Sequence, residues 1–451
     1  MTSLWFETAL LPTGWAQSVR VEMAEGYISR VETGAPSKPA DERHRIALPG
    51  LANVHSHGFQ RGMAGLAEYR GASDDDFWSW REVMYRFLNH LNPDDVEAIN
   101  AMSFVEMLES GFTHVGEFHY LHNDTDGGRY ANPAEMAERV VAAANATGIG
   151  LTLLPVFYAH SDFGGAPPKH GQRRFINDID GFAKLLEASK NLAPNDVIFG
   201  VAPHSLRAVT PDELQALLIL NPDGPIHIHA AEQMNEVKAS VATFGARPVE
   251  WLLDNAEVDA RWCLIHATHM TDAETDRLAR SGAVSGLCPI TEANLGDGIF
   301  PALRYMSAGG RIGMGTDSNI LINAAEELRA LEYSQRLSHR ARNVLASDRH
   351  PSVGGRLFSA ALSGGAQALG IKSGITVGMR ADIITLNSAH PFLYRHGGDQ
   401  LLDSWIFASK AGRIDAVWCN GYRLVSQGRH IAADPTIIRY ANVIKKILSR
   451  C

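Results

Sequence analysis

Cysteine is scarce in this sequence. Only four of its 451 residues are cysteine, Cys263, Cys288, Cys419 and Cys451, and no two of them stand at CxxC spacing. Scattered cysteines of this kind indicate neither a disulfide framework nor a thiolate zinc site. The composition is typical of a protein from a reducing compartment, and we expect a cytoplasmic location.

Long hydrophobic runs and an excess of positive charge are also missing. No apolar stretch reaches the ~18 residues of a membrane span, and the opening MTSLWFETALLPTGW lacks a basic segment and contains Glu7 and Pro12. The formal net charge of -9 gives no general attraction to nucleic acid or to an anionic membrane. We therefore expect neither as a partner, and an anionic ligand would need local positive charge.

The sequence does contain a repeated pattern of short apolar runs, each followed by polar residues and a longer helical segment. Eight such runs separated by helices predict a (β/α)₈ barrel, whose catalytic groups lie where the strands end. The runs are RIALPGLANVHSH (45–57), THVGEFHY (113–120), GLTLLPVFYAH (150–160), VIFGVAPHS (197–205), PIHIHAAE (225–232), WCLIHATH (262–269), AVSGLCP (283–289) and RIGMGTDS (311–318).

Alternating strand patterns flank the barrel at both ends of the chain. We expect residues 1–48 and 371–451 to form one small β-sandwich domain, with the α/β barrel at 49–370. The chain closes on a predicted helix that begins after an Asp434 cap, with Pro435 at its first position.

Histidine and carboxylate side chains gather at the predicted strand ends. His55 and His57 are two apart on a strand and therefore share a face, and His229, His266 and Asp317 end the fifth, sixth and eighth runs. A lone HxH pair could equally be a pair of core or surface histidines. Three further groups at the same rim favour a site for Zn²⁺, or for Fe²⁺, which the sequence does not distinguish from it.

This pattern resembles the amidohydrolase superfamily over the whole chain, and its deaminase branch in particular. The resemblance implies one divalent metal ion per subunit, with the ligands His55, His57, His229 and Asp317. Binuclear relatives carry a bridging Lys or Glu on the fourth strand, and the run at 197–205 has neither, so we expect a mononuclear site.

Several longer stretches are similar to the formimidoylglutamate deiminase family. They are LPGLANVHSHGFQRGMAGLAE, FWSWREVMYRF, VGEFHYLH, LTLLPVFYAHSDFGG, GQRRFIND and VAPHSLRAV. The resemblance implies hydrolysis of N-formimino-L-glutamate to N-formyl-L-glutamate and ammonia in histidine degradation, by a homodimer.

The chemistry of such a reaction assigns roles to three residues. A metal-bound water becomes acidic, and Asp317 is suited to take its proton as the water attacks carbon. Glu232 would carry a proton to the imine nitrogen and then to the departing amine, and His266 would polarise the water and stabilise the tetrahedral intermediate. Glu232 could instead be a carboxylate favoured by the dipole of a helix N-terminus.

Substrate recognition requires cations with planar donors, since the substrate is a dicarboxylate. Arg81 and Arg207 are the candidates, because Arg forms bidentate pairs with carboxylates. Arg81 lies at the edge of an apolar helical stripe and could simply be a half-buried Arg with its charge in solvent, and Arg207 could be a solvated loop residue. The remaining predicted contacts are Gln60, Tyr120 and His204.

Two other functions stay open at this point. A nucleobase or other heterocycle deaminase on the same barrel would need apolar or aromatic walls and would have no use for two Arg at the mouth. A non-catalytic barrel used as a scaffold would usually have lost ligands. His227 and His269 are more simply interpreted as structural, whereas His119 and His122 could either line the mouth or have a structural role.

Overall fold

The computed structural model describes residues 2–69, 76–192, 196–393, 396–410 and 414–449, and it contains two sheets. The larger sheet is parallel and curls into a barrel in the order β10-β11-β12-β13-β5-β6-β7-β8, with β9 paired to β7. Two isolated parallel bridges, Val201 to Ile226 and Ser205 to His229, join the β8–β9 region to β10 and close the barrel. The predicted α/β barrel is confirmed.

Each predicted run contains a barrel strand. The strands are β5 (Leu51–Ser56), β6 (Phe112–His119), β7 (Gly150–Phe157), β8 (Ile198–Phe199), β9 (Ala202–Pro203), β10 (Ile226–Ala230), β11 (Trp262–His266), β12 (Val284–Leu287) and β13 (Arg311–Met314). The fourth run forms two very short strands, β8 and β9, in place of one.

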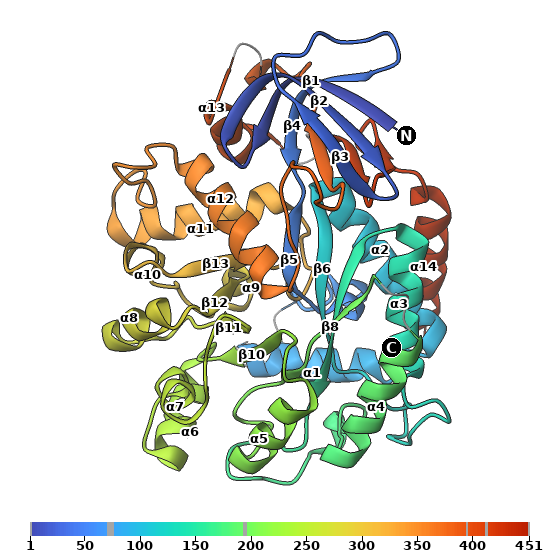
Figure 1. The fold of residues 1–451 in the computed structure, drawn as a ribbon. Helices are drawn as coiled ribbons and strands as arrows, with labels where there is room; N and C mark the ends of the chain where they lie inside the picture. The colour runs from blue at the N-terminus through green and yellow to red at the C-terminus, as the bar shows by residue number, and fades with distance from the viewer. Residues whose placement is uncertain (1, 70–75, 193–195, 394–395, 411–413, 450–451) are drawn as a thin grey trace.

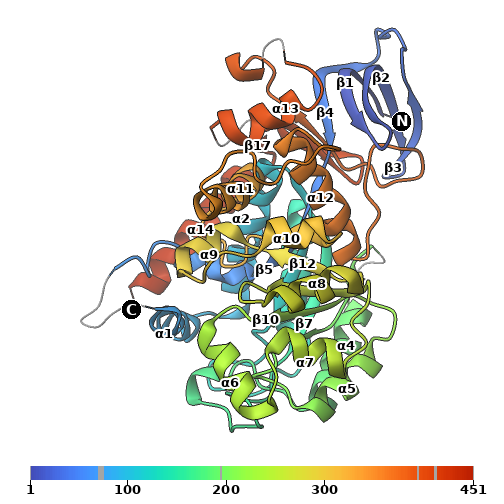
Figure 2. The same ribbon diagram turned by 90° about the vertical axis from the view of Figure 1, so that its left-hand side faces the viewer.

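Helices surround the barrel on its outer side (Figures 1 and 2). They are α2 (Pro93–Ser110), α3 (Glu135–Thr147), α4 (Ile179–Leu192), α5 (Pro211–Leu220), α6 (Met234–Phe244), α7 (Pro248–Asn255), α8 (Asp272–Ser281), α9 (Pro289–Leu295), α10 (Ala302–Ser307), α11 (Ala324–His339) and α12 (Val353–Ala368). Within the described part of the chain, no helix combines the length and the apolar composition that a membrane span needs.

The second sheet is built from both ends of the chain, as predicted. Its order is β17-β16-β15-β14-β4-β1-β2-β3. The strands are β1 (Thr2–Leu11), β2 (Gly14–Ala24), β3 (Tyr27–Glu32), β4 (Glu42–Pro49), β14 (Ile383–Leu386), β15 (Ile414–Cys419), β16 (Tyr422–Ser426) and β17 (Arg429–His430). Side chains from both ends, among them Phe6, Val21, Ile383 and Trp418, share one apolar core.

The run at 45–57 contributes one strand to each of the two sheets. It divides at Gly50, so that β4 pairs with β1 and β14 in the small sheet while β5 pairs with β6 and β13 in the barrel. A Cβ atom at Gly50 would lie 2.3 Å from Oγ1 of Thr113, so the crossing from one sheet to the other needs a glycine.

The closing helix α14 (Ala433–Leu448) exists as predicted and packs against α2, but its predicted start is wrong. Its N-cap is Ala432, and the Asp434 side chain accepts a hydrogen bond from Arg429 and caps nothing.

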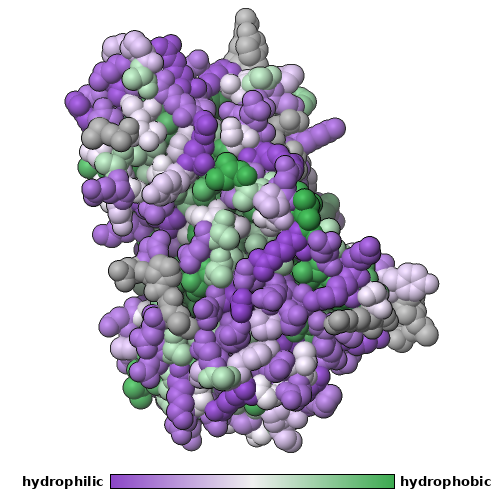
Figure 3. All heavy atoms as spheres, turned by 90° about the vertical axis from the view of Figure 1, so that its right-hand side faces the viewer, coloured by the Kyte–Doolittle hydropathy of each residue, from purple (hydrophilic) through white to green (hydrophobic). Residues whose placement is uncertain are grey.

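Some apolar side chains of α14 are exposed: Ile438 on this helix is 62% exposed. On the molecular face in Figure 3, green apolar groups interrupt the hydrophilic surface.

The remaining helical segments complete the fold. They are η1 (Gly58–Met63), α1 (Phe77–Leu88), η2 (His170–Gln172), η3 (Pro391–Leu393), α13 (Gln400–Asp403) and the π-helical turn η4 (Ser404–Ala408). Helix α1 lies at the end of the barrel away from the small sheet, which is the end where the parallel strands finish (Figure 1). It therefore borders the expected active-site mouth.

Candidate active site

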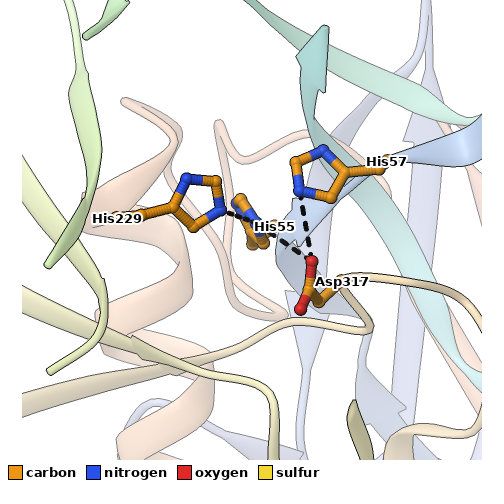
Figure 4. A group of neighbouring side chains, drawn as sticks. All are labelled: His55, His57, His229 and Asp317. Carbon is orange, nitrogen blue, oxygen red and sulfur yellow. Dashed lines mark hydrogen bonds and ion pairs between the residues drawn. The ribbon is translucent and has the colours of Figure 1, made fainter. Parts of the chain in front are cut away.

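Four buried side chains converge at the carboxyl ends of the barrel strands (Figure 4). His57 Nε2 lies 3.2 Å and His55 Nε2 lies 3.4 Å from Oδ1 of Asp317, and the Nε2 atoms of His55 and His229 are 3.0 Å apart. One potential ligand atom from each residue lies within 4.8 Å of all the others. The structure thus brings together the four residues predicted as metal ligands.

Backbone contacts orient two of the imidazoles. The Nδ1–H of His57 donates to the carbonyl of Phe118 at 3.0 Å, and the Nδ1–H of His229 donates to the carbonyl of His204 at 2.9 Å. A neutral imidazole that donates from Nδ1 keeps its Nε2 lone pair for a metal. Three imidazole nitrogens and one carboxylate in a buried cluster fit Zn²⁺ or Fe²⁺.

The strand ends that carry these ligands are tied to each other. The backbone N–H of Asp317 donates to His55 O at 3.0 Å, and the N–H of His57 donates to Asp317 O at 2.9 Å. Asp317 has a φ of 45°, a left-handed conformation that is uncommon for a residue other than glycine. Such backbone strain is typical of functional sites, because the surrounding structure must hold it.

Glu232 and His266 lie beside this cluster. His266 Nε2 is 3.7 Å from Oε1 of Glu232 and 3.8 Å from Oδ2 of Asp317. Burial raises the pKa of Glu232 to about 7. Burial alone would lower the pKa of His266, but the neighbouring carboxylates, Glu232 first, outweigh it and raise that pKa well above its usual value. The pair has the protonation properties of acid–base catalysts.

Glu232 is not the carboxylate that interacts with the helix N-terminus, because Glu236 has that position. Glu236 in the first turn of α6 accepts the backbone N–H groups of Ala231 at 3.1 Å and of Glu232 at 3.2 Å. The Glu232 side chain lines the pocket beside His266 and Asp317 instead.

Glu292 is a site residue that the sequence analysis missed. Its Oε1 lies 3.2 Å from Nδ1 of His266 and accepts the backbone N–H of Cys288 at 2.9 Å. This contact fixes the His266 ring with Nε2 toward Glu232 and Asp317. Glu292 lies on α9, and no spacing motif connects it to the run that ends at His266.

The pocket in front of the cluster brings together all five predicted substrate contacts. They are Gln60, Arg81, Tyr120, His204 and Arg207. Nε2 of Gln60 donates to the Tyr120 hydroxyl at 2.7 Å, while the buried Oε1 of Gln60 has no partner among the described residues. It is therefore free to accept a hydrogen bond from a ligand.

Neither arginine has the surroundings of a solvated surface residue. Arg207 is only 6% exposed, and the buried Nε atoms of Arg81 and Arg207 have no hydrogen-bond partner within the described residues. In that same part of the chain, no carboxylate forms an ion pair with either guanidinium. Burial opposes the charge of Arg207, but the neighbouring carboxylates, Glu236 first, raise its pKa without pairing with the guanidinium. Two guanidinium groups that lack an ion-pair partner at one pocket favour a ligand that carries negative charge.

Aromatic residues that the sequence analysis did not assign complete the pocket wall. Phe77 and Trp80 on α1 line the pocket, together with Tyr85, Tyr158 and Phe175. The Tyr158 hydroxyl accepts a hydrogen bond of 2.8 Å from Nε2 of Gln172. Tyr158 directly follows β7, at a predicted strand end, whereas the other four come from α1 and from the loop after η2, whose positions depend on the tertiary fold.

The four further histidines weighed in the sequence analysis lie outside the metal cluster. His122 donates to Val156 O at 2.8 Å, His227 to Ala368 O at 2.8 Å, and His269 to Asp297 O at 2.8 Å. Nε2 of His119 has no partner among the described residues. Three of these imidazoles thus hold the backbone in place.

Comparison with known proteins shows which family has this architecture. The amidohydrolase family matches residues 46–424, and the family described as "Formimidoylglutamate deiminase HutF, N-terminal domain" matches residues 1–45. The chain belongs to the amidohydrolase family. The formimidoylglutamate deiminase of Pseudomonas aeruginosa is 47% identical, over 99% of this chain and 100% of that protein. The resemblance seen in the sequence motifs is confirmed.

Other relatives agree with this assignment. A crystal structure of an amidohydrolase from Brucella melitensis superposes with a TM-score of 0.97 at 52% identity, covering 99% of this chain and 100% of that one. A 5-methylthioadenosine/S-adenosylhomocysteine deaminase from Shouchella clausii is 26% identical over 94% of this chain and 93% of its own. This nucleoside deaminase is thus a more distant relative than the formimidoylglutamate deiminase.

Proposed function

We propose that this protein hydrolyses N-formimino-L-glutamate to N-formyl-L-glutamate and ammonia, a step of histidine degradation. The observation that carries the proposal is the placement of Arg81 and Arg207, neither of which forms an ion pair with a described carboxylate, in one pocket with the Glu232–His266 pair. The 47% identity to a formimidoylglutamate deiminase over essentially the whole chain supports it.

The proposed site holds one divalent ion through His55, His57, His229 and Asp317. Zn²⁺ is the first candidate and Fe²⁺ the second, because both accept imidazole nitrogen with a carboxylate oxygen. When bound, such an ion lowers the pKa of water and so supplies a nucleophile at neutral pH.

The protein's own groups move the protons. Asp317 takes a proton from the attacking water as a C–O bond forms at the formimino carbon, and Glu232 protonates the imine nitrogen as the C=N π bond opens. His266 donates from Nε2 to the oxygen of the tetrahedral intermediate. Asp317 then passes the proton it took from the water to the ionised Glu232, which delivers it to the nitrogen, so that the nitrogen leaves as ammonia with the C–N electrons. The hydroxyl of the intermediate loses its proton to Glu232 as the formyl carbonyl forms, which restores protonated Glu232 and ionised Asp317.

The substrate is held by a second group of residues that line the same pocket. Arg81 and Arg207 bind the carboxylates, and Gln60, Tyr120 and His204 position the formimino group near Glu232. This division between binding and reacting groups is supported by the pocket lining, where the arginines stand apart from the metal cluster in sequence and share one cavity with it.

The alternative, a deaminase of nucleobases or other heterocycles, has weaker support. The aromatic wall of the pocket would suit a flat ring, but two unpaired guanidinium groups would not. The 5-methylthioadenosine/S-adenosylhomocysteine deaminases of Shouchella clausii and Natronomonas pharaonis are only 26% and 28% identical to this chain.

An ammonia-release assay tests the proposal. Metal-replete protein should release ammonia from N-formimino-L-glutamate and not from guanine, cytosine or adenosine. Ammonia from a nucleobase with none from formiminoglutamate would reverse the assignment. A protein that binds no metal and releases no ammonia from any of them would support a scaffold function.

Three further expectations belong to this proposal. We propose that the protein acts in the cytoplasm as a homodimer, and that its domains divide as 1–48, 49–370 and 371–451. Support comes from the family resemblance, and for the location also from the free, buried thiols Cys263, Cys288 and Cys419. Light scattering of the purified protein at several concentrations measures the oligomeric state.

A further inference from the structure

Both pocket arginines lie over the same aromatic ring. The Cζ of Arg81 is 4.3 Å and the Cζ of Arg207 is 5.7 Å from the centroid of the Trp78 ring. We propose that Trp78 is a positioning residue for substrate binding, which holds the two guanidinium groups as a pair so that they can receive the substrate's carboxylates. This inference rests on the proposed function.

A shared aromatic partner would stabilise the two cations as a pair, in addition to the carboxylates near Arg207 and the Tyr85 ring 5.6 Å from Cζ of Arg81. Like charges held at one pocket repel each other, and burial removes the water that would otherwise solvate them. Among the described residues no carboxylate pairs with either guanidinium, and each has a buried Nε without a hydrogen-bond partner. Both distances to Trp78 fall within the range of about 6 Å over which a ring face attracts a cation.

An indole suits this position better than a carboxylate would. A carboxylate would neutralise a guanidinium by accepting its N–H groups, and would therefore compete with the substrate for the same donors. A ring face attracts the cation through its quadrupole and leaves the donors at the edge of the guanidinium free. The ring thus stabilises the two guanidinium groups while their N–H donors stay free for the substrate.

The location of Trp78 indicates that it acts through the arginines. Phe77 and Trp80, its neighbours on α1, line the pocket, whereas Trp78 is not among the lining residues. Its backbone N–H donates to the side chain of the N-cap residue Asp76 at 2.9 Å, which fixes the first turn of the helix. The indole is therefore held behind the guanidinium groups and out of contact with the ligand.

Binding of glutarate, an unreactive five-carbon dicarboxylate, provides the test. Isothermal titration calorimetry on the metal-replete protein should show that Trp78→Leu weakens glutarate binding by about 5- to 30-fold. Trp78→Phe, which keeps an aromatic face, should lose much less. With N-formimino-L-glutamate as substrate, the loss should appear mainly in KM, because the reacting groups are untouched.

A thermodynamic cycle separates positioning from a merely structural role. In an Arg81→Met background, Trp78→Leu should weaken glutarate binding by a smaller factor than in the wild type, because one of its two cations is gone. Val83→Ala is the control: it truncates a half-buried side chain on the same helix that does not line the substrate pocket. Its effect should be the same in both backgrounds.

Equal losses for Trp78→Leu in both backgrounds would overturn the inference, as would a Trp78→Phe protein that binds as poorly as Trp78→Leu. If Trp78→Leu does not fold by circular dichroism, the same cycle is run with Trp78→Phe, where the coupling should be smaller but of the same sign. Wild-type protein that does not bind glutarate also overturns it. Protein that binds glutarate with this coupling but releases no ammonia from formiminoglutamate would instead remove the proposed function alone.

Discussion

At the scale of single residues, the site depends on carboxylates whose environments differ. Asp317 is surrounded by imidazoles, and although burial opposes ionisation, His55 and His57 hold the pKa of Asp317 well below its usual value. Glu232 has no such set of partners, and burial raises its pKa to about 7. Two carboxylates with pKa values pushed apart can divide the roles of charged ligand and proton donor.

Replacing Glu232 by Gln should therefore separate catalysis from binding. The amide keeps the shape of the side chain but cannot transfer a proton, so kcat should fall by about 10²- to 10⁴-fold. Metal content and glutarate affinity should stay near those of the wild type. Steady-state kinetics together with metal analysis check this, and near-normal turnover would remove Glu232 from the mechanism.

Asp297 allows a test of how the stability of the folded protein depends on pH. It is buried, accepts a hydrogen bond from Gln233, and burial raises its pKa to about 9. Because the folded pKa exceeds that of the unfolded chain, the stability from its protonated form is complete below pH ~4 and is lost as the pH rises toward 9. Asp297→Asn has no proton to lose there.

The difference in unfolding temperature between Asp297→Asn and the wild type should therefore move in favour of the variant between pH 6 and pH 9. Thermal unfolding at three or four pH values measures it. A difference that stays constant over this interval would show that Asp297 titrates in the folded protein much as it does in the unfolded chain.

At the scale of elements, helix α1 connects local structure to substrate binding. The Asp76 side chain caps it by accepting the N–H groups of Trp78 and Ser79, and the Ser79 hydroxyl accepts the backbone N–H of Asp76. The first two turns then place Arg81 at the pocket with Trp78 behind it. The geometry of the binding wall thus depends on one helix N-terminus.

Asp76→Ala should raise KM for the dicarboxylate substrate and lower the free energy of unfolding by about 1 kcal/mol, as the loss of an N-cap does. Asn92→Ala is the matched control, because Asn92 caps α2 in the same manner, by accepting Asp95 N–H at 2.9 Å. It should cost similar stability and leave KM unchanged. Equal KM values for the two variants would mean that the α1 cap has no part in binding.

At the scale of the whole molecule, the metal cluster joins distant parts of the barrel. His55 lies on β5 and His57 directly follows it, His229 lies on β10, and Asp317 follows β13. A bound ion stabilises only the folded chain, by about 2.7 kcal/mol at a free concentration of 100 times its dissociation constant. Metal removal should therefore lower both activity and the unfolding temperature.

His57→Ala should reproduce that effect from the protein side. Metal content by mass spectrometry and ammonia release should fall together, and added Zn²⁺ should no longer raise the unfolding temperature as it does in the wild type. A folded His57→Ala protein with full metal occupancy would show that His57 is not a ligand.

Much of this architecture could be predicted from the sequence because its signals are local. Short apolar runs separated by helices predict the barrel, and parallel strands bring their carboxyl ends to one face, so the sequence alone predicts that His55, His229 and Asp317 lie together. The wall of the pocket could not be predicted in this way. Glu292 and Phe175 reach the site from a helix and a loop, and only tertiary packing decides where those lie. The predicted cap of α14 was wrong for a related reason, since Arg429 competes for the Asp434 side chain.

The division of one run at Gly50 also bears on how the protein is made. Strands β1 to β4 leave the ribosome first, yet β4 pairs with β14, which is synthesised only after the entire barrel. Until β14 is made, the edge of β4 that will pair with it has unpaired backbone groups, and such edges can pair with other chains. The late pairing of β14 with this edge therefore covers a strand edge that the first strands alone would leave open.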